Sequence, residues 1–303
     1  MPTSDLRSAP APRALVPRLQ VLAAALLFSS GGAAIKAVHL TSWQVACFRS
    51  AVAALALLLL MPEARRRPNL RILAVGAIHA ATLILFVQAN KLTTAAGAIF
   101  LQATAPLYVL LFSPWLLKER VRGADIFYMG ALALGLGCFF LGLDPVSATA
   151  PNPLLGNVFA ALSGLCWGLT IMGLRALGRA GGEGEGAAAT AAVWGNAFAF
   201  AACLLWALPV GETRPMDWGL IAFLGLFQVA FAYVFLTRGI GKVRAIEASL
   251  LLLLEPVLNP LWAWIVHGEE PGGWSVAGGA VILAATAAKS WWDVRRAAAP
   301  VPV

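Results

Sequence analysis

The chain has 303 residues, of which 60% are hydrophobic and only 12% are charged, with a formal net charge of +8. A soluble globular domain carries about 25% charged residues, so this composition excludes an ordinary water-soluble protein of this size. The apolar residues come in blocks of about 20, the length that crosses a ~30 Å hydrocarbon core as a helix. We therefore predict an all-α polytopic membrane protein, since the short alternating strands of a membrane barrel are absent.

Breaks at Pro, Gly and charged residues divide the chain into ten apolar segments. In chain order they span residues 17–36, 42–61, 70–90, 94–116, 123–143, 154–175, 189–210, 217–237, 245–267 and 273–292. The first segment follows basic residues, as a signal peptide does, but nine further spans follow it, so we interpret it as a retained helix. The four cysteines lie inside apolar segments without a CxxC pair, which predicts buried thiols rather than disulfides or a metal site. We expect no metal and no other cofactor.

The Lys and Arg residues lie in the short gaps between these segments, which indicates membrane topology rather than a nucleic-acid partner. They concentrate in alternate gaps, and Arg65, Arg66 and Arg67 after the second span form the clearest cluster. Cytoplasmic loops of membrane proteins carry the excess of Lys and Arg. The alternation therefore predicts that both termini are cytoplasmic and that the loop 144–153 is outside.

The second half of the chain resembles the first. A shift of 150 residues aligns residues 98–123 with 248–273 without a gap, and Pro106 then matches Pro256. An odd number of spans in each half inverts the second copy in the membrane. We predict two inverted five-helix repeats at 19–143 and 154–292, between cytoplasmic tails at 1–18 and 293–303.

Several stretches carry a family resemblance: Arg49 early in the second span, "APLYVLLFSPWLLKERVRGADIFYMGALALGLG" (105–137), "LCWGLTIMGLR" (165–175) and "LLEPVLNPLWAWIVHGEEPGG" (253–273). They look like the two EamA domains of the drug/metabolite transporter superfamily, and the resemblance covers residues ~19–292. It implies ten helices in two inverted units around a central cavity, lined mainly by the first four helices of each unit. It also implies transport of small metabolites, often the export of amino acids or related compounds. The first span departs from the family, with "FSSGG" (28–32) where a "WGS"-like sequence is common.

Glu255 is the most informative single residue. It lies about ten residues into the ninth span, ~15 Å along a helix and near the bilayer centre. A carboxylate facing lipid at that depth costs several kcal/mol, so we expect Glu255 to face the protein interior, with Asn259 and Trp262 on the same helical face. Pro256 and Pro260 remove backbone donors and predict a kink beside this face. Glu255 then either binds a substrate amine or a proton, or only bonds backbone groups freed by the kink.

Arg49 lies about seven residues into the second span and also requires an interior position, unless its charged end reaches the interface. It could hold an anionic group, pair with Glu255, or form a structural ion pair at the outer mouth. The other candidates are intramembrane polar or aromatic side chains, each of which is also explained by packing between helices. As a set they predict an amphipathic cavity: His79 (with Thr82, Phe86 and Asn90 on one helical stripe), Gln102, Tyr108, Trp167, Asn196 and Gln228.

Two further patterns concern the scaffold. Glu119 and Glu269 end matched spans and each precedes the start of the next helix, so we predict helix-end caps, since an anion suits the helix dipole there. We also predict a kink at Pro106, the partner of Pro256. The small-residue runs 130–137 and 272–288 predict close packing of the fifth and tenth spans, or a homodimer surface.

These observations predict a secondary transporter of small metabolites in a bacterial cell membrane, working by alternating access around a central cavity. An integral membrane enzyme is one alternative, but HExxH, GxSxG and paired aspartates are absent, so we expect no enzyme. A non-transporting scaffold is the other. The small-molecule substrate and the lipid bilayer are the expected partners. A zwitterion or a moderately apolar solute fits the few intramembrane cations best, with drugs, amines or sugar-type metabolites as alternatives.

Overall fold

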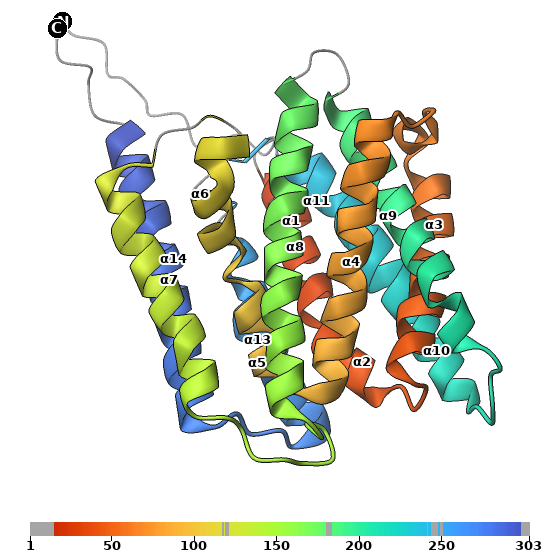
Figure 1. The fold of residues 1–303 in the computed structure, drawn as a ribbon. Coiled ribbons are helices and arrows are strands. Elements are labelled where there is room, and N and C mark those ends of the chain that lie inside the picture. The colour runs from red at the N-terminus through yellow and green to blue at the C-terminus, as the bar shows by residue number, and fades with distance from the viewer. Residues whose placement is uncertain are drawn as a thin grey trace, which may run out of the picture.

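The computed structural model describes residues 15–116, 118, 121–179, 184–240, 242–243, 248 and 251–297. Within these ranges the secondary structure is helical, apart from one isolated bridge between Ser147 and Ala150. The helices run along a bundle in which α1 begins and α14 ends at the same end (Figure 1). We call this the terminal end, and the opposite end, where the loop 142–152 lies, the far end.

The elements follow one another in this order: α1 (Leu15–Ser29), α2 (Gly31–Ala37), α3 (Ser42–Leu60), η2 (Pro62–Arg65), α4 (Leu70–Leu92), α5 (Ala95–Gln102), α6 (Ala105–Leu116), α7 (Gly123–Leu141), α8 (Pro153–Arg179), α9 (Gly184–Ala207), α10 (Pro215–Phe223), η3 (Leu224–Phe231), α11 (Ala232–Ile240), α13 (Leu254–His267) and α14 (Gly273–Ala297). Several helices start at caps that the local sequence supplies. Thr41 accepts from the Gln44 amide, and Asn69 accepts from the Ile72 amide. These caps satisfy amide groups that have no partner inside the helix.

Eight helical segments are long and apolar enough to cross a membrane, and they correspond to the first eight predicted spans. They are Leu15–Ala37, Ser42–Leu60, Leu70–Leu92, Ala95–Leu116, Gly123–Leu141, Pro153–Leu177, Gly186–Ala207 and Pro215–Ile240. The ninth predicted span is described only in part, as the 14-residue α13 and a few residues before it. The tenth contains the 25-residue α14, which is rich in Gly and Ala and carries Lys289 and Asp293. Ten spans and an inverted repeat therefore stay predictions.

Two of the spans are interrupted near proline. α5 ends at Gln102 and α6 begins at Ala105, while α13 begins at Leu254 after a turn at Leu253. Pro106 and Pro256 lie in the first turns of α6 and α13, where their missing N–H groups would have no helical partner in any case. The two interruptions occupy matched positions of the predicted repeat, because Leu253 is 150 residues beyond Ala103.

The first span is also divided, at Ser30 between α1 and α2. Gly31 and Gly32 begin α2 and let side chains from the second half of the chain approach closely. A Cβ at Gly31 would lie 2.9 Å from the Gln228 amide nitrogen, and one at Gly32 would lie 2.3 Å from Asn259 Oδ1. The sequence "FSSGG" therefore has a packing reason, since any larger residue would collide with these amides.

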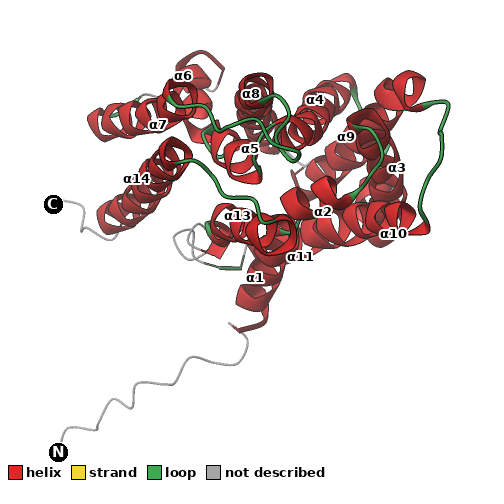
Figure 2. Ribbon diagram, turned by 90° about the horizontal axis from the view of Figure 1, so that it is seen from below, coloured by secondary structure: helices red, strands yellow, loops and turns green. Residues whose placement is uncertain are grey.

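Helices α7 and α14 lie side by side at one edge of the bundle (Figures 1 and 2). They touch through glycine: a Cβ at Gly135 would lie 3.0 Å from the Gly278 carbonyl oxygen, and one at Gly278 would lie 2.6 Å from the Gly135 carbonyl oxygen. Small residues allow this close approach of two backbones within a membrane. The packing predicted for the runs 130–137 and 272–288 is thus present between α7 and α14, and a homodimer surface stays a prediction.

Candidate functional site

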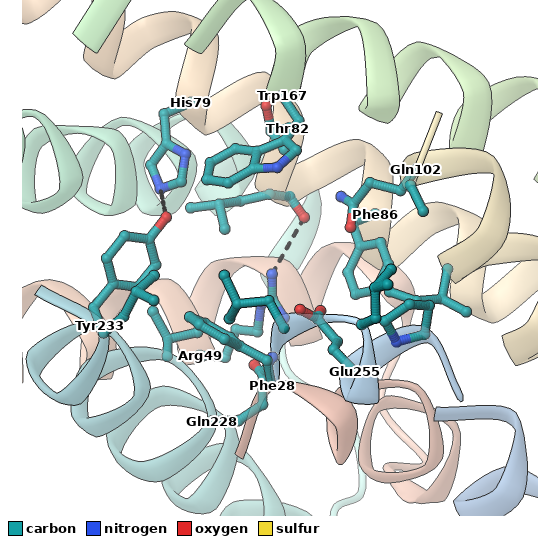
Figure 3. A pocket seen from close by; sticks show the side chains of 18 of the residues that line it. Phe28, Arg49, His79, Thr82, Phe86, Gln102, Trp167, Gln228, Tyr233 and Glu255 are labelled. Atoms are coloured by element: carbon teal, nitrogen blue, oxygen red, sulfur yellow. Dashed lines mark hydrogen bonds between the residues drawn. The ribbon is translucent and has the colours of Figure 1, made fainter. Parts of the chain in front are cut away.

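A cavity of about 340 Å³ lies where the two interrupted spans meet (Figure 3). Ile99, Gln102 and Ala103 line it at the α5–α6 break, and Leu252, Leu253 and Glu255 line it at the start of α13. A proline cannot donate to the carbonyl four residues before it, and here those carbonyls belong to Gln102 and Leu252. Both breaks therefore place irregular backbone beside the cavity, which is where membrane proteins tolerate it.

The cavity contains one cationic and one carboxylate side chain among its described lining residues, Arg49 from α3 and Glu255 from α13. Arg49 is 1% exposed and donates from Nη2 to the Leu83 carbonyl oxygen at 3.4 Å, while its Nε has no protein partner. Glu255 is partly exposed to the cavity and makes no hydrogen bond within the described structure. The two groups form no ion pair with each other. Each charge is thus left available to a ligand.

The opposite wall is aromatic. His79 and Trp167 lie across from Arg49 (Figure 3), with their ring centroids 5.9 Å apart. His79 Nε2 lies 3.3 Å from the Tyr233 hydroxyl, and the two rings meet edge to face. Phe28 packs edge to face on Tyr233 from α1. This wall offers flat apolar surface with one polar edge, which suits a small amphipathic solute.

Hydrogen bonds fix the polar residues of the adjoining wall. Gln102 donates to the Ser163 hydroxyl at 2.8 Å, and Ser163 donates to the Thr82 carbonyl oxygen at 3.0 Å. These contacts hold the end of α5 against α8 and α4. Gln228 projects from the opposite side with its Oε1 unpaired, and His79 Nδ1 is also unpaired. Buried polar groups without a partner are costly, so a bound solute or water would satisfy them.

Six of the predicted cavity residues line this cavity: Arg49, His79, Gln102, Trp167, Gln228 and Glu255. Asn259 and Trp262 do not, although they share a helical face with Glu255. Asn259 is fully buried against Gly32, and Trp262 donates from Nε1 to the Ser29 hydroxyl at 3.0 Å. The reason is that only the first turn of α13 reaches the cavity, whereas its later turns pack on α1 and α2.

Tyr108 and Asn196 also lie outside the cavity lining. Tyr108 is partly buried on α6 beside Gly168, and Asn196 is buried and donates to the Ala192 carbonyl oxygen of its own helix at 2.9 Å. The predicted kinks take a different form as well. The chain breaks before Pro106 and Pro256 rather than bending at them, and α13 continues without interruption through Pro260.

The predicted caps differ between the two glutamates. Glu119 lies outside the described residues. Glu269 accepts from the amide of Ala95 at the start of α5, so it lies at the N-terminus of a different helix from the one predicted. Asp144, rather than Glu269, lies at the start of α14, where it accepts a hydrogen bond from the amide of Gly272. Both carboxylates still meet the positive end of a helix dipole.

The sequence pattern of the EamA-like transporter family matches residues 18–143 and 154–290, which together make up most of the chain. The chain belongs to this family. Its fold is similar to that of a solved structure, with a TM-score of 0.60 and 21% sequence identity. The superposition covers 93% of this chain and 99% of the solved chain. At that identity the likeness establishes the fold alone.

Two curated proteins with transporter names are similar in sequence to this chain. The pseudopaline exporter CntI of Pseudomonas aeruginosa (strain UCBPP-PA14) is 28% identical over 282 residues, which covers 90% of this chain and 95% of the relative. An uncharacterized transporter of Archaeoglobus fulgidus is 27% identical over 223 residues, covering 72% of this chain and 75% of the relative. Family and relatives together identify a multi-pass membrane protein of a small-molecule transporter family.

In this EamA-family chain, sequence reasoning missed Tyr233 and Phe28, which both line the cavity. Tyr233 follows Gln228 by five residues, so a search for partners at i+3, i+4 and i+7 passes over it. The structure explains the spacing, since η3 is a π-helix and π-helices bond at i to i+5. Phe28 immediately precedes the "SSGG" sequence at which the first span is divided. Its position beside a helix break could have predicted that Phe28 lines the cavity.

The cavity supplies groups that can bind a small polar solute. Arg49 can hold a carboxylate or another anion, Glu255 can hold an amine or a proton, and Gln102 and Gln228 can exchange hydrogen bonds with a polar solute. In the part of the chain that is described, no group of three His, Cys, Asp or Glu residues is placed to hold a metal ion.

Proposed function

We propose that this protein is a secondary transporter that carries a small zwitterionic metabolite of the amino-acid type through alternating access around the cavity. The observation that carries this proposal is the meeting of two interrupted helices at a cavity holding one unpaired cation and one unpaired carboxylate. Transporters of other folds place their sites at such breaks, near the interface of inverted repeats.

The charges of the cavity support a zwitterion. Arg49 is buried and Glu255 is partly exposed to the cavity, and no ion pair joins them, so each leaves an opposite charge to be supplied. An α-amino acid carries both a carboxylate and an ammonium group and satisfies both residues at once. A dianionic sugar phosphate would meet Arg49 but would place a second negative charge near Glu255. An apolar amine, the second candidate, would use Glu255 and the aromatic wall and leave Arg49 without a counter-ion.

The size of the cavity fits the same class. About 340 Å³ is at the small end of ligand sites, so a single small metabolite fills it. The relative that is named as an exporter of pseudopaline supports outward transport, and we extend that direction to this chain. Both termini then lie in the cytoplasm, and the two halves of the chain form inverted repeats that rock around the cavity.

Replacement of Glu255 by Gln tests the role of the carboxylate. The change keeps shape and volume but removes the negative charge that faces the substrate ammonium group. Because a hydrogen bond to a charged group contributes about 1.5–3 kcal/mol, we expect initial flux at low substrate concentration to fall about tenfold or more. The measurement is initial flux in proteoliposomes loaded with a panel of amino acids, amines and sugar phosphates, across a series of pH values.

The matched control is Glu63→Gln, which removes an exposed carboxylate at η2 and should leave flux unchanged. If Glu255 also exchanges a proton, the Glu255→Gln flux loses pH dependence that the wild-type protein has. Arg49, His79 and Tyr233 are the other titratable groups of the cavity, and all three remain in the variant. Wild-type flux and an unchanged pH profile in Glu255→Gln would make this carboxylate structural. Absence of flux of any solute through the wild-type protein would count against transport itself.

A further inference from the structure

Lys36 and Glu269 form an ion pair at the far end of the bundle, away from the cavity. Their Nζ and Oε2 atoms are 2.9 Å apart, and the side chains are only 3% and 4% exposed. Lys36 lies in α2, within the first predicted repeat, and Glu269 follows α13 in the second. Sequence reasoning does not distinguish such a pair from residues at a membrane interface, because each lies near the end of a span.

Each member of the pair makes further contacts with the backbone of the first half. Lys36 donates to the carbonyl oxygens of Thr93, at 2.7 Å, and Thr149. Glu269 accepts from the amide of Ala95, the first residue of α5. The pair therefore joins α2, the start of α5 and the loop after α13 at one point. A surface ion pair is free to separate, whereas this one is held by groups on several elements.

A second carboxylate extends the contact. Asp144, which is 5% exposed, accepts from the Thr94 hydroxyl at 2.7 Å and from the Gly272 amide and Ser275 hydroxyl at 2.8 Å each. Thr94 caps α5, and Gly272 immediately precedes α14. The start of α5 is thus attached to the start of α14 beside the Lys36–Glu269 pair. We call Lys36, Glu269, Asp144, Thr94 and Ser275 the far-end network.

Helix α5 connects this network to the cavity. It has only eight residues, Ala95 to Gln102. Its N-cap Thr94 and its first residue Ala95 lie at the network, while Ile99 and Gln102 line the cavity. At 1.5 Å per residue, about 10 Å of rigid helix separates its two ends. A movement of the start of α5 away from α2 therefore also moves Ile99 and Gln102. The far-end network and the cavity are mechanically joined.

From these contacts we propose that the Lys36–Glu269 pair is the gate that closes the cavity toward the far end. The proposal rests on the proposed transport function, because a gate implies two accessible states. In the structure the gate is shut. Opening requires Lys36 and Glu269 to separate. Water then hydrates both charged groups and replaces the contact between them. Removal of either partner alone leaves a buried charge without a counter-ion, and hydration in the open state relieves it.

A single thiol introduced into the cavity reports on this gate without any transported substrate. The background carries Ser in place of Cys47, Cys138, Cys166 and Cys203, and Ile99→Cys supplies the reporter thiol. A small membrane-impermeant thiol reagent is applied to membrane vesicles from the side that bears the far end. That side is identified by the labelling of Glu212→Cys, an exposed position in the loop that joins α9 to α10 at the far end (Figure 1). The measured quantity is the labelling rate of the reporter thiol at position 99.

We expect Lys36→Met and Glu269→Gln each to raise this rate about tenfold or more, because the lost ion pair shifts the population toward the open state. The side-chain amide oxygen introduced by Glu269→Gln can still accept from the Ala95 amide, so that variant removes the charge and keeps the helix contact. The double variant leaves no unpaired charge and should label more slowly than either single variant. Additive increases in the double variant would contradict a gate based on charge pairing.

Lys289 provides the matched control. It forms an ion pair with Asp125 at 3.1 Å that joins α14 to α7, away from the two broken helices. Lys289→Met should leave the labelling rate of the reporter thiol unchanged. An equal increase in Lys289→Met, or wild-type labelling in Lys36→Met and Glu269→Gln, would overturn the gate. Unfolding of the single variants is recognised by labelling that is equally fast from both sides, and that outcome also counts against the gate.

The result is separable from the transport assay. Wild-type labelling in the gate variants, together with solute flux that depends on Glu255, would leave transport standing and remove the gate. Charge-dependent labelling without flux of any solute in the panel would leave two accessible states of the cavity standing and would count against the proposed transport function.

Discussion

Gly32 and Asn259 make one of the tightest contacts in the molecule. A Cβ at Gly32 would lie 2.3 Å from Asn259 Oδ1, far inside van der Waals contact. We expect Gly32→Ala to lower stability by about 1–3 kcal/mol, the usual cost of overpacking a buried site. The measurement is thermal unfolding in detergent. Gly130→Ala is the control, because a Cβ there meets nothing within 4 Å.

Asn259 also offers a test of the cause. Both polar atoms of its amide lack a hydrogen-bond partner in the described structure. The double variant Gly32→Ala with Asn259→Ala should recover much of the loss, since the second change removes the colliding oxygen. An unchanged loss in the double variant would place the damage in the backbone of the α1–α2 break instead.

At the residue scale, burial of charge was the most reliable sequence signal. Arg49 and Glu255 had to face the protein interior because lipid exposure is costly, and both line the cavity. Asn259 and Trp262 were predicted to lie in the cavity from helical periodicity, and neither lines the cavity in the structure. Periodicity gives the face of a helix but not how far along the helix a cavity extends, and here it reaches only the first turn of α13.

Among the helices, the interruptions before Pro106 and Pro256 shape the cavity. Pro256→Ala supplies an amide that can donate to the Leu252 carbonyl oxygen and continue the helix across Leu253. We expect the substrate flux of this variant to fall by about tenfold, because the backbone that lines the cavity is rearranged, while the midpoint of thermal unfolding stays equal or rises. Flux and unfolding are measured on the same preparation.

Pro260→Ala is the matched control, since α13 is continuous through Pro260 and the residue does not line the cavity. It should keep wild-type flux. If Pro256→Ala also keeps wild-type flux, the interruption is not needed for transport, and the cavity works with a continuous helix.

The proline positions could be read from the sequence, but the form of the break could not. A proline inside an apolar block predicts a kink, and the chain instead ends one helix and starts another. The difference arises because Pro106 and Pro256 lie in the first turn of the following helix, where proline is tolerated without strain. The π-helical η3 gave no sequence signal, and this concealed Tyr233.

For the whole molecule, the orientation in the membrane is open to a direct test. The connection from α3 to α4, which contains Arg65, Arg66 and Arg67, lies at the terminal end (Figure 1), and the loop 142–152 lies at the far end. Because cytoplasmic loops carry the excess of positive charge, we expect Arg67→Cys to react with an impermeant thiol reagent only from the cytoplasm. Val146→Cys, whose position is 74% exposed, should react only from outside.

The assay compares intact cells with inside-out vesicles, in the background without native cysteines. Protection of Val146→Cys in intact cells, combined with reactivity in inside-out vesicles, would reverse the orientation and with it the direction that the gate faces. Reactivity of both positions from one side would contradict the span count.

The overall architecture was accessible from the sequence because blocks of about 20 apolar residues have few alternatives to a spanning helix. Eight of the ten predicted spans meet that criterion in the structure. The tenth is not among them, since the Gly, Trp, Ser and Lys residues of α14 lower its mean hydropathy. On one face of α14 small residues allow the close contact with α7 at Gly135 and Gly278.

This contact of α14 bears on how the protein is made. Gly279 rests on the ring of Phe100, and Thr286 completes the cavity wall, yet α14 follows every other described helix. During synthesis α7 therefore enters the membrane before α14 exists, so its glycine face is uncovered. The residues of α14 that pack on this face lie about 140 residues further along the chain. A nascent chain that ends before residue 273 lacks the part of the cavity wall that α14 supplies at Thr286, even when its earlier helices have inserted. We therefore expect the wall of the cavity to be complete only after the last helix has been synthesised.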